Sequence, residues 1–149
     1  MTTPPPADDE GPRRRHRVLL VREWDQQTNG SGCCGRLEGG DSEIAGASDF
    51  GHCRPDMEAM GEVYRALRVE LPQIEVEVVD PRNLTFLMPG MLGDARRGGA
   101  SWREAFRELR RGCGQGAIVV DGRVVSIGVI SPADAAVGMV LRQLATSAR

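Results

Sequence analysis

The chain of 149 residues contains no lysine, so every one of its 19 Lys or Arg positions is an arginine. A Walker-type P-loop is therefore excluded, because that motif needs a lysine beside the phosphates. Only two histidines are present, and no serine has a matching base for a nucleophilic triad. No apolar run approaches the roughly 20 residues of a membrane-spanning helix. These absences exclude P-loop nucleotide chemistry, disfavour serine-hydrolase chemistry and predict no membrane span.

The net charge and residues 1–15 bear on the binding partners and the cellular location of the protein. The net charge is -2, so no overall field would recruit nucleic acid or an acidic membrane. Residues 1–15 have no apolar stretch before their charges, so we expect no secretory signal and a cytoplasmic location. In that compartment, four cysteines are expected to be free thiols, metal ligands or redox groups rather than structural disulfides.

The sequence predicts a polar tail followed by one domain. Residues 1–15 are rich in proline, acids and arginine and cannot bury apolar surface, so we expect a disordered tail. Residues 16–149 are long enough for a single domain with a real core. Within that domain, residues 25–55 form a glycine-rich stretch that we expect to be a long loop. Loops of this length in a small domain are usually functional or mobile.

Apolar spacing predicts the order of the secondary-structure elements. We expect strands at residues 17–24 and 74–81, a strand pair within 117–128, helices at 55–71, 101–112 and 131–145, and a helical region interrupted by proline and glycine at 83–99. The first two strands are joined by a helix, which predicts a parallel pair with a right-handed crossover. The last two strands flank Asp121-Gly122, a two-residue hairpin signal. An α/β fold with a mixed sheet between helices follows.

Helix 101–112 carries the clearest local signals. Ser101 and Glu104 form a capping box. Trp102, Phe106 and Leu109 share one apolar face, which we expect to turn toward the core. At the start of helix 55–71, Asp56 is a candidate N-cap.

The element order resembles that of thioredoxin-like proteins. The segment "IVVDGRVVSIGVISPADAA" is similar to the closing unit of glutaredoxins, and Cys33-Cys34 after the first strand resembles the vicinal pair of ArsD-type arsenite metallochaperones. The resemblance implies a thioredoxin-like three-layer fold and thiol-based function. The chain departs from these families by lacking C-x-x-C, a proline near Gly116 and a third cysteine shortly after the pair.

The vicinal pair Cys33-Cys34 is the centre of the functional hypotheses. Consecutive Cα atoms lie about 3.8 Å apart, whereas unstrained disulfides need about 4.4–6.8 Å. A bond between the two sulfurs would therefore be strained. Either one thiol is a nucleophile that a distant cysteine resolves, or the thiolates hold a soft ion such as Cu(I), Zn(II) or trivalent arsenic.

The partner of that pair is expected among the other two cysteines. In the fold that the resemblance implies, the loop before the third strand lies beside the loop after the first, so Cys113 would face the pair. Arg110 and Arg111 would then stabilise a Cys113 thiolate. Cys53 is an accessory candidate, and His52 beside it can lower its pKa or add a nitrogen ligand.

Three functions stay open from the sequence, and so does the question of whether the protein is an enzyme. In the first, Cys33, Cys34 and Cys113 bind a thiophilic metal or metalloid. In the second, Cys33 or Cys34 is the catalytic nucleophile of a thiol-disulfide protein or sensor, resolved by Cys53 or Cys113. In the third, the domain is a scaffold for protein contacts.

The two thiol hypotheses imply a protein partner that exchanges electrons or receives the ion. Helix 101–112 and the residues before it also carry a cluster of arginines, which by default form a solvated face able to dock an acidic partner. Nucleic acid is disfavoured, because neither interleaved aromatics nor a reading helix are evident.

Overall fold

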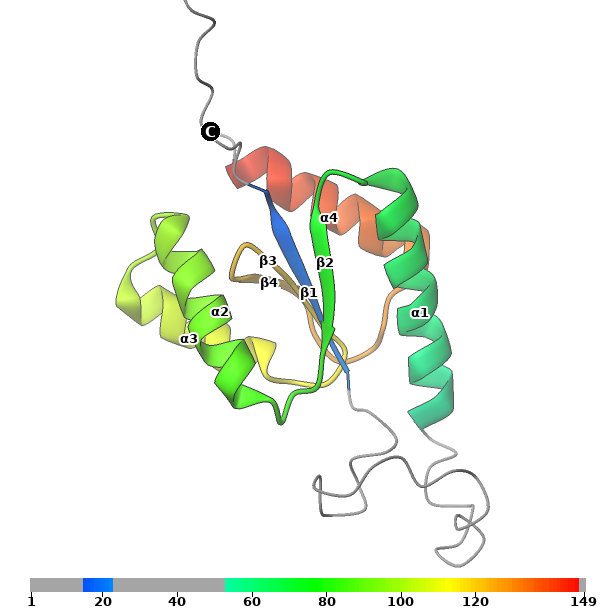
Figure 1. Ribbon diagram of the computed structural model, residues 1–149, viewed down its shortest axis with the longest axis horizontal. Helices are drawn as coiled ribbons and strands as arrows, with labels where there is room; N and C mark the ends of the chain where they lie inside the picture. The colour runs from blue at the N-terminus through cyan, green and yellow to red at the C-terminus, as the bar shows by residue number, and fades with distance from the viewer. Residues whose placement is uncertain (1–14, 23–52, 148–149) are drawn as a thin grey trace, which may run out of the picture.

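The computed structural model describes residues 15–22 and 53–147, apart from the side chains of Cys53 and Arg54 (Figure 1). The predicted tail, except Arg15, and most of the predicted long loop lie outside the described residues. The elements, in chain order, are β1 Arg17–Val21, α1 Cys53–Glu70, β2 Glu75–Val79, α2 Leu84–Arg97, α3 Trp102–Gly112, β3 Ala117–Val120, β4 Arg123–Ser126 and α4 Ala133–Ser147. No helix among them is both long and apolar enough to cross a bilayer.

Within the described residues, four strands form one mixed sheet in the order β2-β1-β3-β4. β1 is parallel to β2 and antiparallel to β3, and β3 is antiparallel to β4. Helices α1 and α4 cover one face of the sheet, and α2 and α3 cover the other (Figure 1). The predicted α/β class, with a parallel first pair and an antiparallel closing hairpin between helices, is confirmed.

Strand β1 supplies both cores of the molecule. Side chains alternate across a strand, so Val18 and Leu20 belong to the core under α1 and α4, while Leu19 and Val21 belong to the core under α2 and α3. All four are almost fully buried. A run of consecutive apolar residues is typical of such a central strand, because both of its faces are covered.

The hairpin between β3 and β4 has the predicted turn. Asp121 has φ 48° and Gly122 has φ 77°, as a type I′ turn requires at both central positions. The Asp121 carboxylate accepts a hydrogen bond from the backbone N–H of Arg17 at 3.0 Å and contacts His16 Nδ1 at 2.7 Å. Gly122 also lies against α2, where a Cβ would come within 2.5 Å of the Met91 carbonyl oxygen. The turn is thus fixed both locally and by packing.

Helix α2 is continuous, although the sequence predicted an interrupted region. Pro89 lies inside the helix, where it removes one backbone hydrogen bond and favours a kink or break. The helix persists through Pro89 while its apolar side packs on the sheet, with Leu87 and Met91 fully buried. Tertiary burial therefore outweighs the local preference here.

Helix α3 is rotated relative to the predicted orientation. Leu109 is buried, but Trp102 is 57% and Phe106 is 52% exposed, so the expectation that all three turn toward the core is wrong. The reason is close packing of small residues. A Cβ at Gly112 would lie 3.2 Å from Val119 Cγ2 and would overlap Met91. The side of α3 that faces the molecule consists of Ala105, Glu108, Leu109 and Gly112.

The two predicted helix caps have different outcomes. The capping box is present: Glu104 N–H donates to Ser101 Oγ at 3.3 Å, and Ser101 N–H donates to Glu104 Oε2 at 2.7 Å. The bonds with Ser101 lower the pKa of the Glu104 carboxyl. Helix α1, in contrast, begins at Cys53, so Asp56 lies within its first turn and is not the N-cap.

Candidate functional site

The loop that carries Cys113 meets the end of β1 and the beginning of α1. We call this place the loop junction and define it by Cys113 to Gly116, Val21 and the first turn of α1. The N–H of Gly116 donates to the Val21 carbonyl at 2.9 Å. Gln115 Nε2 donates to Asp56 Oδ2, also at 2.9 Å. Residues 23–52 connect β1 to α1, so both ends of that segment leave from elements that the loop contacts.

The junction is completed by the loop between β4 and α4. Gly116 has φ 73°, and a Cβ there would overlap the carbonyl oxygen of Gly128. The N–H of Gly128 donates to the Gln115 carbonyl at 3.2 Å. The position before β3 is therefore a glycine for a steric reason, and all peptide bonds of the described chain are trans.

Cys113 forms the C-cap of α3 and is partly buried against the core under α2 and α3. Burial raises the pKa of the Cys113 thiol. The sequence predicted the opposite, a thiolate stabilised by Arg110 and Arg111, and this is wrong. The Arg111 guanidinium instead donates to Glu108 Oε1 at 3.2 Å. Burial at this position thus favours the protonated thiol over the thiolate.

The other predicted site residues are placed only in part. Cys33, Cys34 and His52 lie outside the described residues. Cys53 is the first residue of α1, and only its backbone is described. Among the described side chains, no group of three His, Cys, Asp or Glu residues could hold a metal ion. The structure thus places Cys113 and the backbone of Cys53 on elements that meet at the junction.

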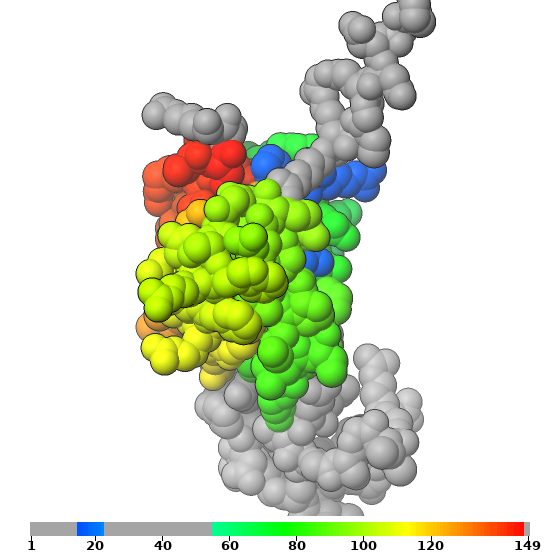
Figure 2. Space-filling view, turned by 90° about the vertical axis from the view of Figure 1, so that its left-hand side faces the viewer, coloured from blue at the N-terminus to red at the C-terminus, as the bar shows by residue number. Residues whose placement is uncertain are grey.

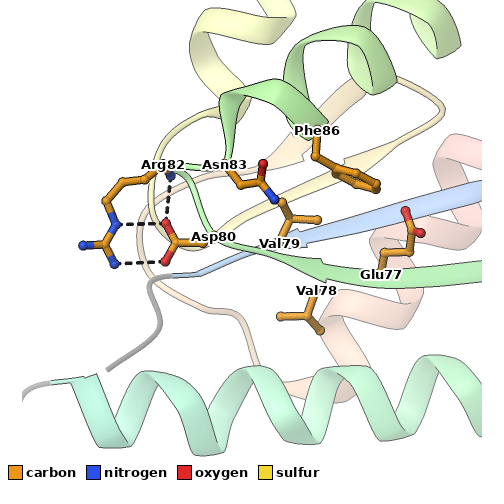
Figure 3. Close-up of a pocket in the computed structure, with 7 residues that line it drawn as sticks. All are labelled: Glu77, Val78, Val79, Asp80, Arg82, Asn83 and Phe86. Atoms are coloured by element: carbon orange, nitrogen blue, oxygen red, sulfur yellow. Dashed lines mark hydrogen bonds and ion pairs between the residues drawn. The ribbon is translucent and has the colours of Figure 1, made fainter. Parts of the chain in front are cut away.

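A pocket of about 700 Å³ lies beside the outer edge of β2, where α2 begins (Figure 3). The Asp80 carboxylate accepts three hydrogen bonds from Arg82, from its backbone N–H at 2.8 Å and from Nε and Nη2 at 3.0 Å each. This pair closes the turn between β2 and α2, and sequence reasoning missed it. Pro81, between the two residues, is the signal for the turn. The pocket is lined by Glu77, Val78, Val79, Asp80, Arg82, Asn83 and Phe86.

Glu77 is the half-buried carboxylate of this pocket. Burial raises the pKa of its side chain, and the Arg17 guanidinium opposes part of that rise. The nearest Arg17 nitrogen is 3.8 Å from Glu77 Oε2, and this oxygen has no hydrogen-bond partner within the described part of the chain. Burial and the missing hydrogen bond therefore disfavour the ionised form of Glu77 in the folded protein.

Comparisons of the chain with protein-family models, with curated proteins and with solved structures found no match. Function is therefore inferred from side chains and their placement. Two chemical features are available for that inference: a thiol at the loop junction and a carboxylate in the pocket beside β2. The thiol has the more specific chemistry, because thiolates select soft ions and exchange disulfides.

Proposed function

We propose that this protein has a thioredoxin-like fold and binds a thiophilic metal or metalloid ion through Cys33, Cys34 and Cys113. Support for the fold comes from the strand order β2-β1-β3-β4 and from the directions of the strands. The placement of helices on both faces agrees with the same architecture (Figure 1). Free thiols of this kind persist in reducing compartments, so the proposal includes a cytoplasmic location.

One observation carries the proposal: the hydrogen bond from the Gly116 N–H to the Val21 carbonyl, 2.9 Å long. It joins the Cys113 loop to the last residue of β1, from which the segment with Cys33 and Cys34 continues. An extended chain covers about 3.3–3.6 Å per residue. The residues between Arg22 and Cys33 therefore provide enough length for the vicinal pair to return to Cys113.

The chemistry of the three thiols fits a soft ion better than a disulfide within the pair. Adjacent cysteines bond each other only with strain, while three sulfurs can share one thiophilic ion. The pKa of Cys113 is raised by burial, so binding must displace its proton. Affinity is therefore expected to increase with pH until Cys113 is ionised in the free protein. Cys53 and His52 are accessory ligands in this proposal, because Cys53 begins the helix that the loop contacts.

The test measures ion binding by the full reduced chain. Zn²⁺ and arsenite are titrated in separate experiments, and bound ion and free thiols are counted. We expect one ion per chain, and we expect Cys33→Ser and Cys113→Ser each to weaken binding at least about tenfold, because each removes a ligand. Cys53→Ser removes only an accessory ligand and is expected to have a smaller effect than either of these variants.

Each alternative has its own result. A disulfide between Cys113 and Cys33 or Cys34, formed without bound ion, would favour the thiol-disulfide protein. Four freely titrating thiols without any bound ion would favour the interaction scaffold. Binding that survives Cys113→Ser would refute the role of the loop junction.

A further inference from the structure

Helix α3 exposes two aromatic rings on the outer side of the molecule. Trp102 is 57% and Phe106 is 52% exposed, and their ring centroids are 6.1 Å apart. The Arg96 guanidinium, from the end of α2, lies 5.0 Å from the centroid of the Trp102 ring. Its Nη1 also donates to the Ala100 carbonyl at 2.5 Å. The Trp102 ring is thus held in place while much of its surface contacts water. Figure 2 shows this side of the molecule, with α2 and α3 toward the viewer.

A second stripe on the same helix is basic. Arg103, Arg107 and Arg110 are all exposed. Residues three and four apart are neighbours on a helix surface, so Arg103, three residues before Phe106, and Arg110, four residues after it, both lie beside the Phe106 ring. We call this surface the α3 face and define it by Trp102, Phe106, Arg96, Arg103, Arg107 and Arg110.

The acids near the α3 face offset only part of its charge. Glu104, on α3 itself, bonds to Ser101 in the capping box and also attracts Arg107. Asp94 and Glu108 have side chains only 9% exposed. Asp94 binds Arg17 and Arg97, and Glu108 accepts from the backbone of Val124 and from Arg111. Within the described part of the chain, Arg103 and Arg110 form no ion pair, and Arg107 has only a long contact of 3.8 Å with Glu108. The α3 face is therefore positive, although the whole chain has a net charge of -2.

We propose that the α3 face docks an acidic protein segment that carries an apolar side chain. Trp and Arg are among the residues enriched at binding hot spots, where surrounding contacts exclude water from the central side chain. Fixing the Trp102 ring beneath Arg96 lowers the entropy lost on binding. The partner would place its apolar side chain against the two rings and its carboxylates against the exposed arginines.

Two other occupants fit the α3 face less well. A second copy docked by two-fold symmetry would bring α3 against α3 and therefore arginines against arginines. Single-stranded nucleic acid binds such proteins by stacking bases on open aromatic faces. The guanidinium of Arg96 already covers one face of Trp102, so a base would have to displace it there. Carboxylates avoid both difficulties, because they pair with the exposed arginines and leave the contact between Arg96 and the Trp102 ring intact.

The experiment begins with random peptides displayed on phage and selected against the full-length reduced protein. We expect the enriched sequences to place Asp or Glu around an aromatic or large aliphatic residue. A synthetic peptide of that sequence is then titrated calorimetrically, with the affinity expected to fall as salt rises. Selection without enrichment of acidic residues would overturn the proposal.

Variants of the α3 face locate the binding surface. Trp102→Ala with Phe106→Ala, and Arg103→Glu with Arg107→Glu, are each expected to weaken binding at least about tenfold. The matched control reverses two exposed arginines on α1, Arg65→Glu with Arg68→Glu, and is expected to change affinity less than about threefold. Circular dichroism checks that each variant folds.

Three results would contradict the assignment. Peptide affinity that is unchanged in the aromatic double variant would remove the α3 face from the interaction. Tighter binding of a single-stranded oligonucleotide than of the peptide would identify a nucleic-acid surface. Sedimentation that shows a dimer dependent on Trp102 would identify a second copy as the occupant.

Discussion

The backbone of Gly116 lies so close to the carbonyl group of Gly128 that position 116 has no room for a side chain. This contact joins the loop before β3 to the loop after β4, and it lies beside the end of β1. Gly116 also has a positive φ of 73°, a conformation that L side chains rarely adopt. The geometry of the loop junction thus depends on a glycine for two separate reasons.

Gly116→Ala is therefore expected to destabilise the protein by roughly 3 kcal/mol or more, because strain and overlap combine. The matched control is Gly99→Ala. Gly99 has φ 82°, but a Cβ at this position would meet nothing within 4 Å, so only the backbone strain remains, about 1–2 kcal/mol. Urea unfolding measures both changes. Equal losses in the two variants would mean that the contact with Gly128 contributes nothing.

Glu108 is expected to stabilise the edge strand β4. Its Oε2 accepts a hydrogen bond from the Val124 N–H at 2.8 Å. Glu108→Ala leaves this backbone donor unsatisfied and is expected to lower the free energy of unfolding by about 2 kcal/mol. Glu108→Gln keeps an oxygen for that N–H and loses only the charge that faces Arg111, so a smaller loss is expected. Chemical denaturation of both variants tests this ordering. An alanine variant as stable as the wild type would contradict it.

Glu77 is expected to make stability depend on pH. Burial raises its folded-state pKa above the unfolded value of about 4.3. The folded state therefore binds the proton more tightly, and this contribution to stability is complete below pH 4 and is lost as pH rises through the folded pKa. Glu77→Gln should thus be more stable than the wild type at pH 7, and the difference should shrink below pH 4.

Unfolding midpoints at pH 7 and at a pH below 4 measure the effect of Glu77→Gln on stability, with Glu75→Gln as the control. Glu75 lies on the same strand and is exposed, so its substitution is expected to change stability by less than about 0.5 kcal/mol at either pH. A glutamine variant at position 77 that loses stability at pH 7 would show that the attraction to Arg17 outweighs burial.

The thiol of Cys113 is expected to react slowly at neutral pH. Burial raises its pKa, and the thiolate is the reactive form. In a chain with Cys33, Cys34 and Cys53 replaced by serine, the midpoint of the alkylation rate against pH should lie above the value of about 8.5 for free cysteine. Iodoacetamide kinetics give this midpoint, and unfolded protein in urea is the control. A midpoint below that of the unfolded chain would contradict the burial argument. It would instead support stabilisation of the Cys113 thiolate by Arg110.

The candidate site was only partly accessible from the sequence. Resemblance predicted that the Cys113 loop would lie beside the loop after the first strand. The structure shows the Cys113 loop bonded to the last residue of β1, and the loop after β1 lies outside the described residues. The placement of Cys33 and Cys34 beside the Cys113 loop stays a prediction. The ionisation of Cys113 was predicted in the wrong direction, because neighbours in sequence indicate charge but not burial. The Asp80–Arg82 pair was missed for a similar reason: its bonds depend on the path of a turn.

The sequence by itself determined the features that depend on a few adjacent residues. The Asp121-Gly122 turn and the Ser101–Glu104 capping box formed as predicted, because their hydrogen bonds and φ angles are satisfied locally. Only the tertiary structure decided that α2 continues through Pro89 and that Trp102 faces outward. Those outcomes depend on packing between distant elements, in which the missing side chain of Gly112 gives α3 its close approach to Met91 and Val119. Periodicity identifies a stripe on a helix, but the shape of the surface beneath it selects which stripe is buried.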